Sequence, residues 1–282
     1  MNCYNFVEYN FDKGLFDNSI DATYVIHLEN NGRINKVIEQ IYKYKPTRKI
    51  YILYNKGFKN CNKLLTKNVP DKDLVHCNLT IFKHAKLNNY NNILVLEDDF
   101  IFSDKIKNKD ILEHLNIFLN DHINEKFIYY IGAGPNFSVP YKKNHYKPFL
   151  ITMAHSNIYS KNTREYILNN ENDASNSWHL WDVYINDLSS IIKYHYKYPL
   201  CYQLFTETEN SKYWKISNNK FINWFIIGFG KYYFKIINLD KTPEPGFTIL
   251  YTLSILSFYI FIFFIIYMIY KYIQLRKKKI NV

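Results

Sequence analysis

The segment Ile93-Leu94-Val95-Leu96-Glu97-Asp98-Asp99-Phe100 decides how this chain is expected to fold. Its apolar run follows an Asn-rich segment and predicts a short strand that is buried on both faces. Three carboxylates come directly after the run, and in open α/β sheets ligands bind beyond the carboxyl ends of the strands. Because three adjacent anions repel one another, we expect a cation beside them, either Mg²⁺ or Mn²⁺ or a Lys or Arg side chain. The alternative is a solvated acidic turn after a core strand.

The sequence around this strand predicts a parallel sheet. Residues 23–28 and 49–54 are rich in β-branched and aromatic side chains, and residues 33–43 between them are apolar at helical spacing. A strand, a helix and a strand in this order form a βαβ unit, whose strands are parallel. We therefore expect one α/β domain. The patterns also predict helices at 74–87, 110–119, 161–168 and 181–192, strands at 127–131 and 149–154, and a loop at Gly132-Ala133-Gly134-Pro135.

Composition excludes several kinds of protein. The 282 residues carry a net charge of +11, but the lysines are spread among Asn, Ile and Tyr along the whole chain. Dispersed charge without a nucleic-acid-binding motif argues against a nucleic-acid partner. The four cysteines (Cys3, Cys61, Cys77 and Cys201) are far apart and form no CxxC pair. This spacing argues against a zinc site and favours free thiols over a disulfide framework.

The C-terminal region predicts a membrane anchor. Residues 249–270 contain no charge and are mostly Ile, Phe, Leu and Tyr, and Arg276-Lys277-Lys278-Lys279 ends the segment. A helix of this length crosses the roughly 30 Å of a bilayer's hydrocarbon core. A Pro/Gly cluster at 243–246 marks the boundary before it. The chain thus divides into an N-terminal extension at 1–20, a domain at 21–217, an aromatic and basic connector at 218–246, a transmembrane helix at 247–272 and a basic tail at 273–282.

Two signals conflict over the orientation of this anchor. The basic cluster at 276–279 belongs on the cytosolic side, which makes the domain lumenal. Residues 1–20, however, lack the apolar run of a cleavable signal peptide, and the cysteines look unpaired. We expect the domain to be cytosolic on these two grounds.

Several segments, in order along the chain, resemble glycosyltransferase family 25, the lipopolysaccharide-biosynthesis and collagen-galactosyltransferase type. The strand at 23–28 with Arg33 after it is similar to that family's opening strand and its nearby arginine. Residues 79–85, followed by the strand that ends in Glu97-Asp98-Asp99, resemble its helix and its LEDD signature. The segments 154–160, 181–185 and 198–203 resemble later parts of the family, whereas Cys77-Asn78 replaces its Ser-His pair and its arginine-rich turn is reduced to Arg33.

The resemblance implies a GT-A-like, Rossmann-like mixed-sheet domain with a divalent metal, Mn²⁺ or Mg²⁺. It implies transfer of a sugar from a nucleotide-sugar donor, such as UDP-galactose, to a hydroxyl of a glycan or glycoprotein acceptor with inversion. In that reaction Asp99 is expected to bind the metal, and Glu97 and Asp98 to contact the donor's ribose or metal-bound water. Arg33 is expected to hold the uridine or a phosphate; the alternative is an exposed arginine at a helix start.

An inverting transfer also needs a carboxylate that takes the proton of the acceptor hydroxyl. Asp182 is the candidate, because Trp178, Trp181 and Tyr184 around it are expected to stack on a sugar and to raise its pKa by desolvation. The alternative is an ordinary acidic residue in the first turn of a helix. His155 is a candidate second metal ligand, and its alternative is a structural role beside a strand.

Two other functions fit parts of the sequence. A catalytically inactive, membrane-tethered carbohydrate-binding module needs the fold and the aromatic residues but not the carboxylate triplet. A metal-dependent nucleotidyltransferase uses a similar crevice, but the sequence has no P-loop. The intact triplet favours an enzyme, and we expect a membrane-anchored, metal-dependent glycosyltransferase.

Overall fold

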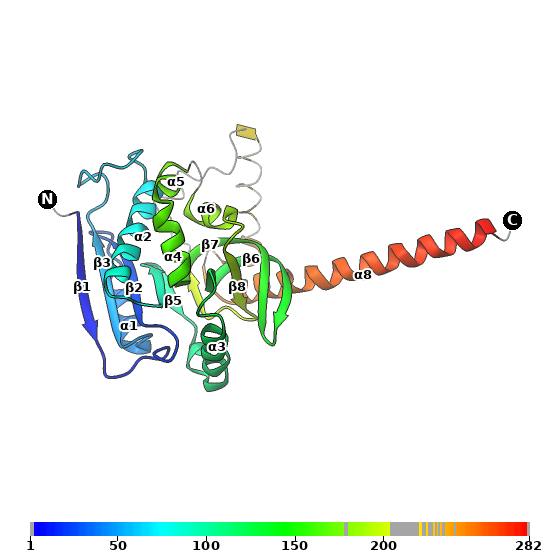
Figure 1. Cartoon of the computed structure of the whole chain (residues 1–282), viewed down its shortest axis with the longest axis horizontal. Coiled ribbons are helices and arrows are strands. Elements are labelled where there is room, and N and C mark those ends of the chain that lie inside the picture. Colours follow the sequence, from blue (N-terminus) through cyan, green and yellow to red (C-terminus); the bar gives the residue numbers. More distant parts are fainter. Residues whose placement is uncertain are drawn as a thin grey trace.

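The computed structural model describes residues 3–177, 180–203 and 241–280, with positions 220, 221, 224, 228, 230, 232 and 235–239. Trp178 and the end of the predicted domain, 204–217, lie outside the described residues, as does much of the connector at 218–246. The predicted architecture is confirmed: a mixed α/β sheet domain precedes a long apolar helix, which projects from one side of the domain (Figure 1).

The predicted βαβ unit forms the parallel part of the sheet. Strands β2 (Ala22–Leu28), β3 (Lys49–Asn55) and β4 (Asn92–Glu97) are parallel, with β2 in the middle. Helix α1 (Ile34–Tyr44) joins β2 to β3, and α2 (Pro70–Leu87) joins β3 to β4. Residues 93–96 are buried on both faces, as their apolar run predicts.

Antiparallel strands extend this unit on both sides. The strand order is β1-β3-β2-β4-β7-β6-β8, and β5 and β9 form a separate two-stranded sheet. Strands β1 and β7 run antiparallel to their neighbours β3 and β4. The bounds are β1 (Tyr4–Asn10), β5 (Phe100–Phe102), β6 (Phe127–Lys142), β7 (His145–Ser160), β8 (Ile192–Tyr196) and β9 (Cys201–Gln203).

Helices cover both faces of the main sheet. One core contains buried residues of α1 and α3 (Lys109–Asp121), and the other contains residues of α2, α4 (Lys161–Asn169) and α6 (Trp181–Asp187). The short helices η1 (Asp104–Lys107) and α5 (Glu171–Asn176) complete the described part of the domain.

Three sequence predictions differ from the structure. The expected extension 1–20 contains β1, which pairs with β3 along its whole length and so belongs to the sheet. The predicted helix 181–192 ends at Asp187, because Ile192 already pairs with Phe127 of β6. The predicted loop at 132–135 lies inside β6, where the ladder with β7 continues through two register shifts.

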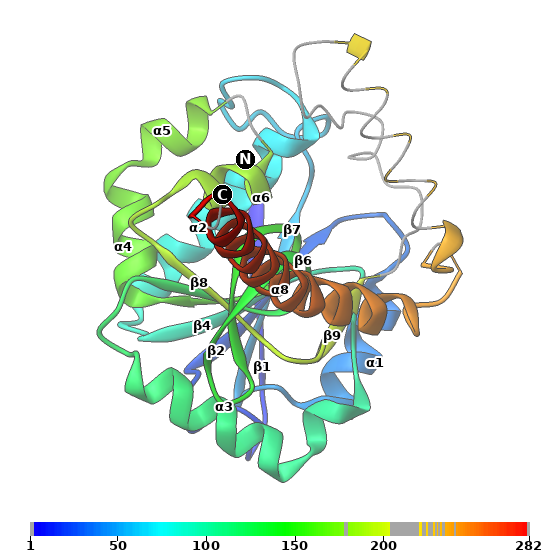
Figure 2. The same cartoon turned by 90° about the vertical axis from the view of Figure 1, so that its right-hand side faces the viewer.

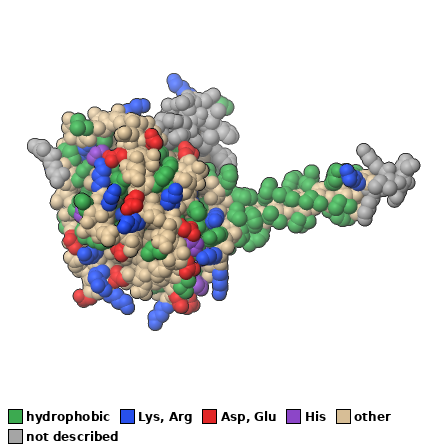
Figure 3. Space-filling model, viewed as in Figure 1, with side chains coloured by type: hydrophobic (Ala, Val, Ile, Leu, Met, Phe, Trp, Pro, Cys, Tyr) green, Lys and Arg blue, Asp and Glu red, His purple; other side chains and the backbone are tan. Residues whose placement is uncertain are grey.

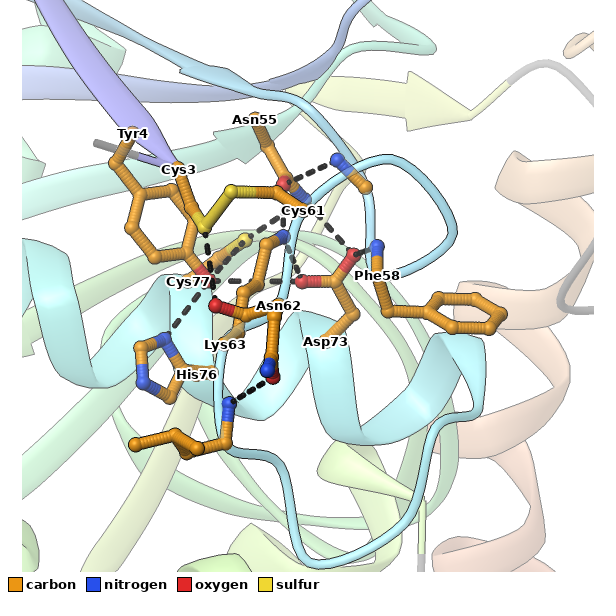
Figure 4. The surroundings of a disulfide bond; sticks show 12 residues. Cys3, Tyr4, Asn55, Phe58, Cys61, Asn62, Lys63, Asp73, His76 and Cys77 are labelled. Atoms are coloured by element: carbon orange, nitrogen blue, oxygen red, sulfur yellow. Dashed lines mark hydrogen bonds and ion pairs between the residues drawn. A yellow bond between two sulfur atoms is a disulfide. The ribbon is translucent and has the colours of Figure 1, made fainter. Parts of the chain in front are cut away.

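The expectation of free thiols is correct for Cys77 and Cys201 but wrong for Cys3 and Cys61, which form a disulfide (Figure 4). The pairing of β1 with β3 brings Cys3 beside the loop that follows β3, and the backbone N–H of Lys56 donates to the Cys3 carbonyl. The bond joins residues 58 positions apart. Cross-linking a loop of this size reduces the entropy of the unfolded chain, which is worth about 4 kcal/mol.

A buried ion pair lies beneath the disulfide. The Lys63 ammonium, whose side chain is fully buried, pairs with Asp73 of α2 and donates to the side-chain oxygen of Asn55 (Figure 4). Asp73 also accepts from the backbone N–H of Phe58 at 3.0 Å, and the ammonium lies 4.6 Å from the centre of the Tyr4 ring. The disulfide and the ion pair together fix the loop between β3 and α2.

Helix α8 (Gly246–Ile280) packs into the domain at its start and contains the predicted anchor. Residues 246–276 form a helix that is long and apolar enough to span a membrane, and an 18-residue window within it has a mean hydropathy of 2.5. Its first turns are buried in the domain, however: Tyr251 is 1% exposed, Phe247 is fully buried, and Ser254 bonds to Ser138 of β6 at 2.6 Å. Figure 2, viewed along α8, shows its base beside β6 and β9. The predicted boundary at 247 therefore lies about three turns too early.

This boundary predicts how truncated chains behave. A chain that ends at residue 258 keeps Phe247, Tyr251 and Ser254 in place, whereas one that ends at 245 loses all three. Because removing a single buried aromatic side chain costs about 3–5 kcal/mol, we expect the shorter chain to unfold at a much lower temperature or not to fold. Thermal unfolding of both chains, followed by circular dichroism, measures this. Equal midpoints would show that the helix base contributes nothing to the domain.

Candidate active site

The site lies where β2 and β4 end. Their parallel pairing sets Ile26 opposite Glu97, so the turn after β2 and the carboxylates after β4 meet at one edge of the sheet. Asp98 joins the two segments. Its Oδ2 lies 3.0 Å from His27 Nδ1 and accepts from the Leu28 backbone N–H at 3.1 Å and from Asn31 at 2.5 Å.

Arg33 supplies the cation that the carboxylate triplet requires. Its guanidinium donates to Asp98 Oδ1 at 2.9 Å and lies 3.5 Å from Asp99 Oδ2. Burial alone would raise the pKa of Asp98, but the bonds from His27, Arg33 and Asn31 outweigh it and lower that pKa. Asp98 is therefore an anion that holds the 27–33 turn, and Arg33 is an ion-paired residue of the site.

Asp99 is the carboxylate with unused bonding capacity. It is 4% exposed, and the Gln203 side-chain amide donates to its Oδ2 at 3.1 Å. Gln203 is in place because β9 pairs with β5, which sets it opposite Phe100. Asp99 Oδ1 is buried and has no hydrogen-bond partner among the described residues. Burial raises the pKa of Asp99 to about 6, although Gln203 and Arg33 act in the opposite direction.

Asp182 lies close enough to the triplet for its charge to act on Glu97. Burial raises the pKa of Glu97 well above its usual value, and the charges of Asp99, Asp98 and Asp182 raise it further. Burial likewise raises the pKa of Asp182, as the sequence predicts. Asp182 Oδ1 accepts from the Val183 N–H at 2.9 Å, and Oδ2 accepts from the Met153 N–H of β7 at 3.3 Å.

His155 lies beside the end of β4. It is one residue beyond the Leu96–Ser156 pair of the β4–β7 ladder, level with Glu97. Its Nδ1 donates to the Met153 carbonyl at 2.9 Å, and its Nε2 is buried with no hydrogen-bond partner among the described residues. Burial lowers the pKa of His155 to about 4, which leaves the ring neutral at pH 7. Metal binding by His155 stays a prediction.

The expected sugar-stacking wall is wrong for Trp181 and Tyr184. Both rings are buried in the core between the sheet and α2, where Trp181 donates to Tyr159 at 3.1 Å and lies beside Phe82. Their apolar surfaces are used to pack α6, so they cannot bind a sugar. Trp178, the third ring, lies outside the described residues.

The carboxylates suit a hard divalent cation. The described residues contain no cluster of three or more His, Cys, Asp and Glu side chains arranged to hold a metal. Mg²⁺ in nucleotide-binding enzymes needs only one or two carboxylates, because substrate phosphates and water complete its shell. The buried, unpartnered Asp99 Oδ1 provides one such ligand, so the residues present fit Mg²⁺ or Mn²⁺ brought by a phosphorylated substrate.

Three residues of the site lack a strong signal in the sequence. His27 and Asn31 bind Asp98 from the end and the turn of β2, and Gln203 binds Asp99 from a three-residue strand. The sequence Glu29-Asn30-Asn31-Gly32 is typical of a turn, and it marks Asn31 only as a turn residue. The resemblance of residues 198–203, which contain Pro199 and Gln203, to a later part of family 25 is the one sequence signal for Gln203.

Comparisons with known proteins give fold likenesses of low similarity. No protein-family model matches the chain, and no curated protein matches its sequence. A solved glycosyltransferase involved in glycosylation of the major capsid of PBCV-1 is 12% identical with a TM-score of 0.42, over 68% of this chain and 95% of that one. A197 from STIV is 11% identical with a TM-score of 0.41, over 67% and 86%. A putative glucose-1-phosphate thymidylyltransferase from Bacillus anthracis is 12% identical with a TM-score of 0.34, over 67% and 73%.

The two glycines of β6 provide a matched test of how tightly the site is packed. A Cβ on Gly132 would lie 2.2 Å from the Cys201 carbonyl oxygen and 2.6 Å from His155 Nε2, so β9 and its Gln203 would have to move. A Cβ on Gly134 meets only side chains, the nearest being Thr152 Oγ1 at 2.8 Å. We expect Gly132→Ala to destabilise the protein by about 1–3 kcal/mol and Gly134→Ala to cost less. Thermal unfolding of both variants in detergent measures the difference, and an equal or larger loss in Gly134→Ala would contradict the packing described.

Proposed function

We propose that this chain is a metal-dependent glycosyltransferase that uses a nucleotide-sugar donor. The observation that supports it most is Asp99, a buried carboxylate with one oxygen left unpartnered at the carboxyl end of β4. Arg33 and Gln203 hold its other oxygen in place. The ordered resemblance to family 25 adds the donor class, because that family's LEDD signature corresponds to this segment.

The roles of the residues follow from their contacts. Asp98 locks the 27–33 turn and orients Arg33, whose guanidinium is then available to a phosphate as well as to Asp99. Asp99 would hold Mn²⁺ or Mg²⁺ through Oδ1, with Glu97 beside it toward the donor's ribose or a bound water. The metal, when bound, neutralises the charge that develops on the leaving diphosphate.

Asp182 is the proposed base. In an inverting transfer the bond between the anomeric carbon and the diphosphate breaks, and the acceptor oxygen forms the new bond on the opposite face of the sugar. The acceptor hydroxyl gives its proton to a carboxylate, and Asp182 Oδ2, with its longer 3.3 Å bond to Met153, is the oxygen we assign. Burial raises the pKa of Asp182, which makes it a stronger base than an exposed aspartate.

The function is tested by replacing the unpartnered carboxylate. We expect Asp99→Asn to lower the release of nucleoside diphosphate from nucleotide sugars roughly 100-fold or more, since it removes one metal ligand and its charge. The full chain in detergent, with Mn²⁺ or with a chelator, is assayed against a panel of nucleotide sugars. Asp12→Asn, which changes an exposed carboxylate after β1, is the control.

The outcomes separate the candidate functions. Loss of turnover in Asp99→Asn with unchanged circular dichroism, and normal turnover in Asp12→Asn, support the proposal. Wild-type turnover in Asp99→Asn rules out the metal site. Pyrophosphate release from nucleoside triphosphates and sugar phosphates identifies a nucleotidyltransferase, and sugar binding without turnover of any donor identifies an inactive binding module.

We further propose that α8 anchors the protein in a membrane with the domain on the oxidising side. The expectation of a cytosolic domain rests partly on unpaired cysteines, and the disulfide between Cys3 and Cys61 removes that ground. Disulfides persist in secretory and extracellular compartments and are rare in the cytosol. The Arg276–Lys279 cluster favours the same orientation, because basic residues after a span stay on the cytosolic side.

Thiol counting and protease protection test this orientation together. In protein made by a eukaryotic host and denatured, we expect two cysteines to react with a maleimide before reduction and all four after it. Cys61→Ser should raise the first count to three, because Cys3 is released. In intact microsomes the domain should resist added protease until detergent is present. Digestion of the domain without detergent, whatever the thiol count, would place it in the cytosol.

A further inference from the structure

The long β6–β7 hairpin joins the domain to α8 through an aromatic contact. The Phe137 ring packs edge-on against Phe258 and Phe261 of α8, with ring centres 6.0 and 5.6 Å apart. Phe137 has a φ of +49°, a backbone conformation that side-chain-bearing residues rarely adopt. The adjacent Ser138 is buried and bonds to Ser254 at 2.6 Å. The hairpin and the helix therefore form one joined surface.

From this contact onward α8 leaves the domain. Residues 259–276 are exposed on all sides, and all of those before Lys271 are apolar or Tyr. Figure 3 shows this continuous apolar surface, which begins where the helix emerges from the domain. If α8 spans a bilayer, the hydrocarbon region must begin close to Phe258, since the helix from residue 259 to 275 is only about 26 Å long and the hydrocarbon core is roughly 30 Å thick. The domain then rests directly on the lipid.

Phe149 lies on the hairpin at the same level. Asn136 pairs with Leu150 and Ser138 pairs with Pro148, so Phe149 is opposite Phe137. Phe149 is 86% exposed, and Leu150 beside it is 44% exposed. Because side chains alternate along a strand, Phe149 lies on the same face of the hairpin as Phe137, the residue that packs against α8, and Leu150 lies on the other face. A large apolar side chain this exposed beside an anchor helix favours contact with lipid. Figure 1 shows that the hairpin lies on the side of the domain from which α8 projects.

Basic residues occupy the end of the same hairpin. Lys143 lies at its turn and is exposed, Lys142 beside it pairs with Asp121 at 3.4 Å, and Lys147 stacks over the Tyr141 ring with its ammonium 3.9 Å from the ring centre. Aromatic side chains partition into the interfacial layer of a bilayer, and lysine side chains beside a membrane extend their ammonium groups to the headgroup layer. The hairpin thus combines the two kinds of residue that bind a lipid interface.

We propose that the β6–β7 hairpin is a second membrane contact, in which Phe149 enters the lipid interface beside α8 and the hairpin lysines bind headgroup phosphates. The proposal rests on the anchor proposed above. The two contacts together fix the height and tilt of the domain over the bilayer, which a single helix does not do.

Site-specific fluorescence in vesicles tests this contact. Phe149→Cys, Leu87→Cys and Ile262→Cys are each labelled with an environment-sensitive dye in the full chain; the native Cys77 and Cys201 are buried. Leu87, which is 86% exposed at the end of α2 and precedes the opposite end of β4, is the matched control. The labelled proteins are reconstituted in phosphatidylcholine vesicles with and without nitroxide-labelled lipid.

The expected result is strong quenching at positions 149 and 262 and little at 87, with a blue-shifted emission at 149. Quenching at 262 without quenching at 149 overturns the hairpin contact and leaves the anchor intact. Absence of quenching at 262 overturns the anchor and with it the hairpin contact. Equal quenching at 149 and 87 overturns the proposal as well, because the dye is then entering lipid wherever it is exposed.

Discussion

The parallel pairing of β2 with β4 is the constraint on which the site depends. It ends both strands at the same edge of the sheet and sets Ile26 opposite Glu97. Asp98 is therefore close enough to bind the turn after β2. That turn places Arg33 against both Asp98 and Asp99. A shift of one residue in the pairing would turn every side chain of β4 to the other face, so the roles of the three carboxylates would be exchanged. Packing of residues 93–96 on both faces prevents that shift.

The parts that sequence predicts well are those whose pattern is local. Residues 93–96 form an unbroken apolar run, and α2 begins at Pro70 with acidic residues in its first turn, so both elements are visible without the fold. Strand β1 has no such pattern, because it lies at the sheet edge and its residues alternate between exposed and half-buried. Its role as a strand comes from hydrogen bonds to β3, which no local pattern reports.

The parts that sequence misses depend on contacts between distant residues. The disulfide requires β1 to pair with β3, and Gln203 reaches Asp99 only because β9 pairs with β5. The base of α8 is a different case. Phe247 is buried in the core, and the phenylalanines in the exposed half of the helix have the same hydropathy. Hydropathy alone therefore cannot distinguish a residue buried in protein from one that faces lipid.

Contacts at the base of α8 connect the proposed anchor to the site. The Phe247 ring packs edge-on against His155 and lies beside Tyr202, the neighbour of Gln203, while the Tyr202 hydroxyl donates to Glu244 at 2.5 Å just before the helix. At 1.5 Å per residue, the helix from Phe247 to Tyr259 is about 18 Å long. A rigid helix of that length holds the carboxylates a fixed, short distance from the exposed apolar surface. On the proposed seating, an acceptor must present its hydroxyl within about 20 Å of the bilayer surface, which favours acceptors that are themselves bound to the membrane over freely diffusing glycans.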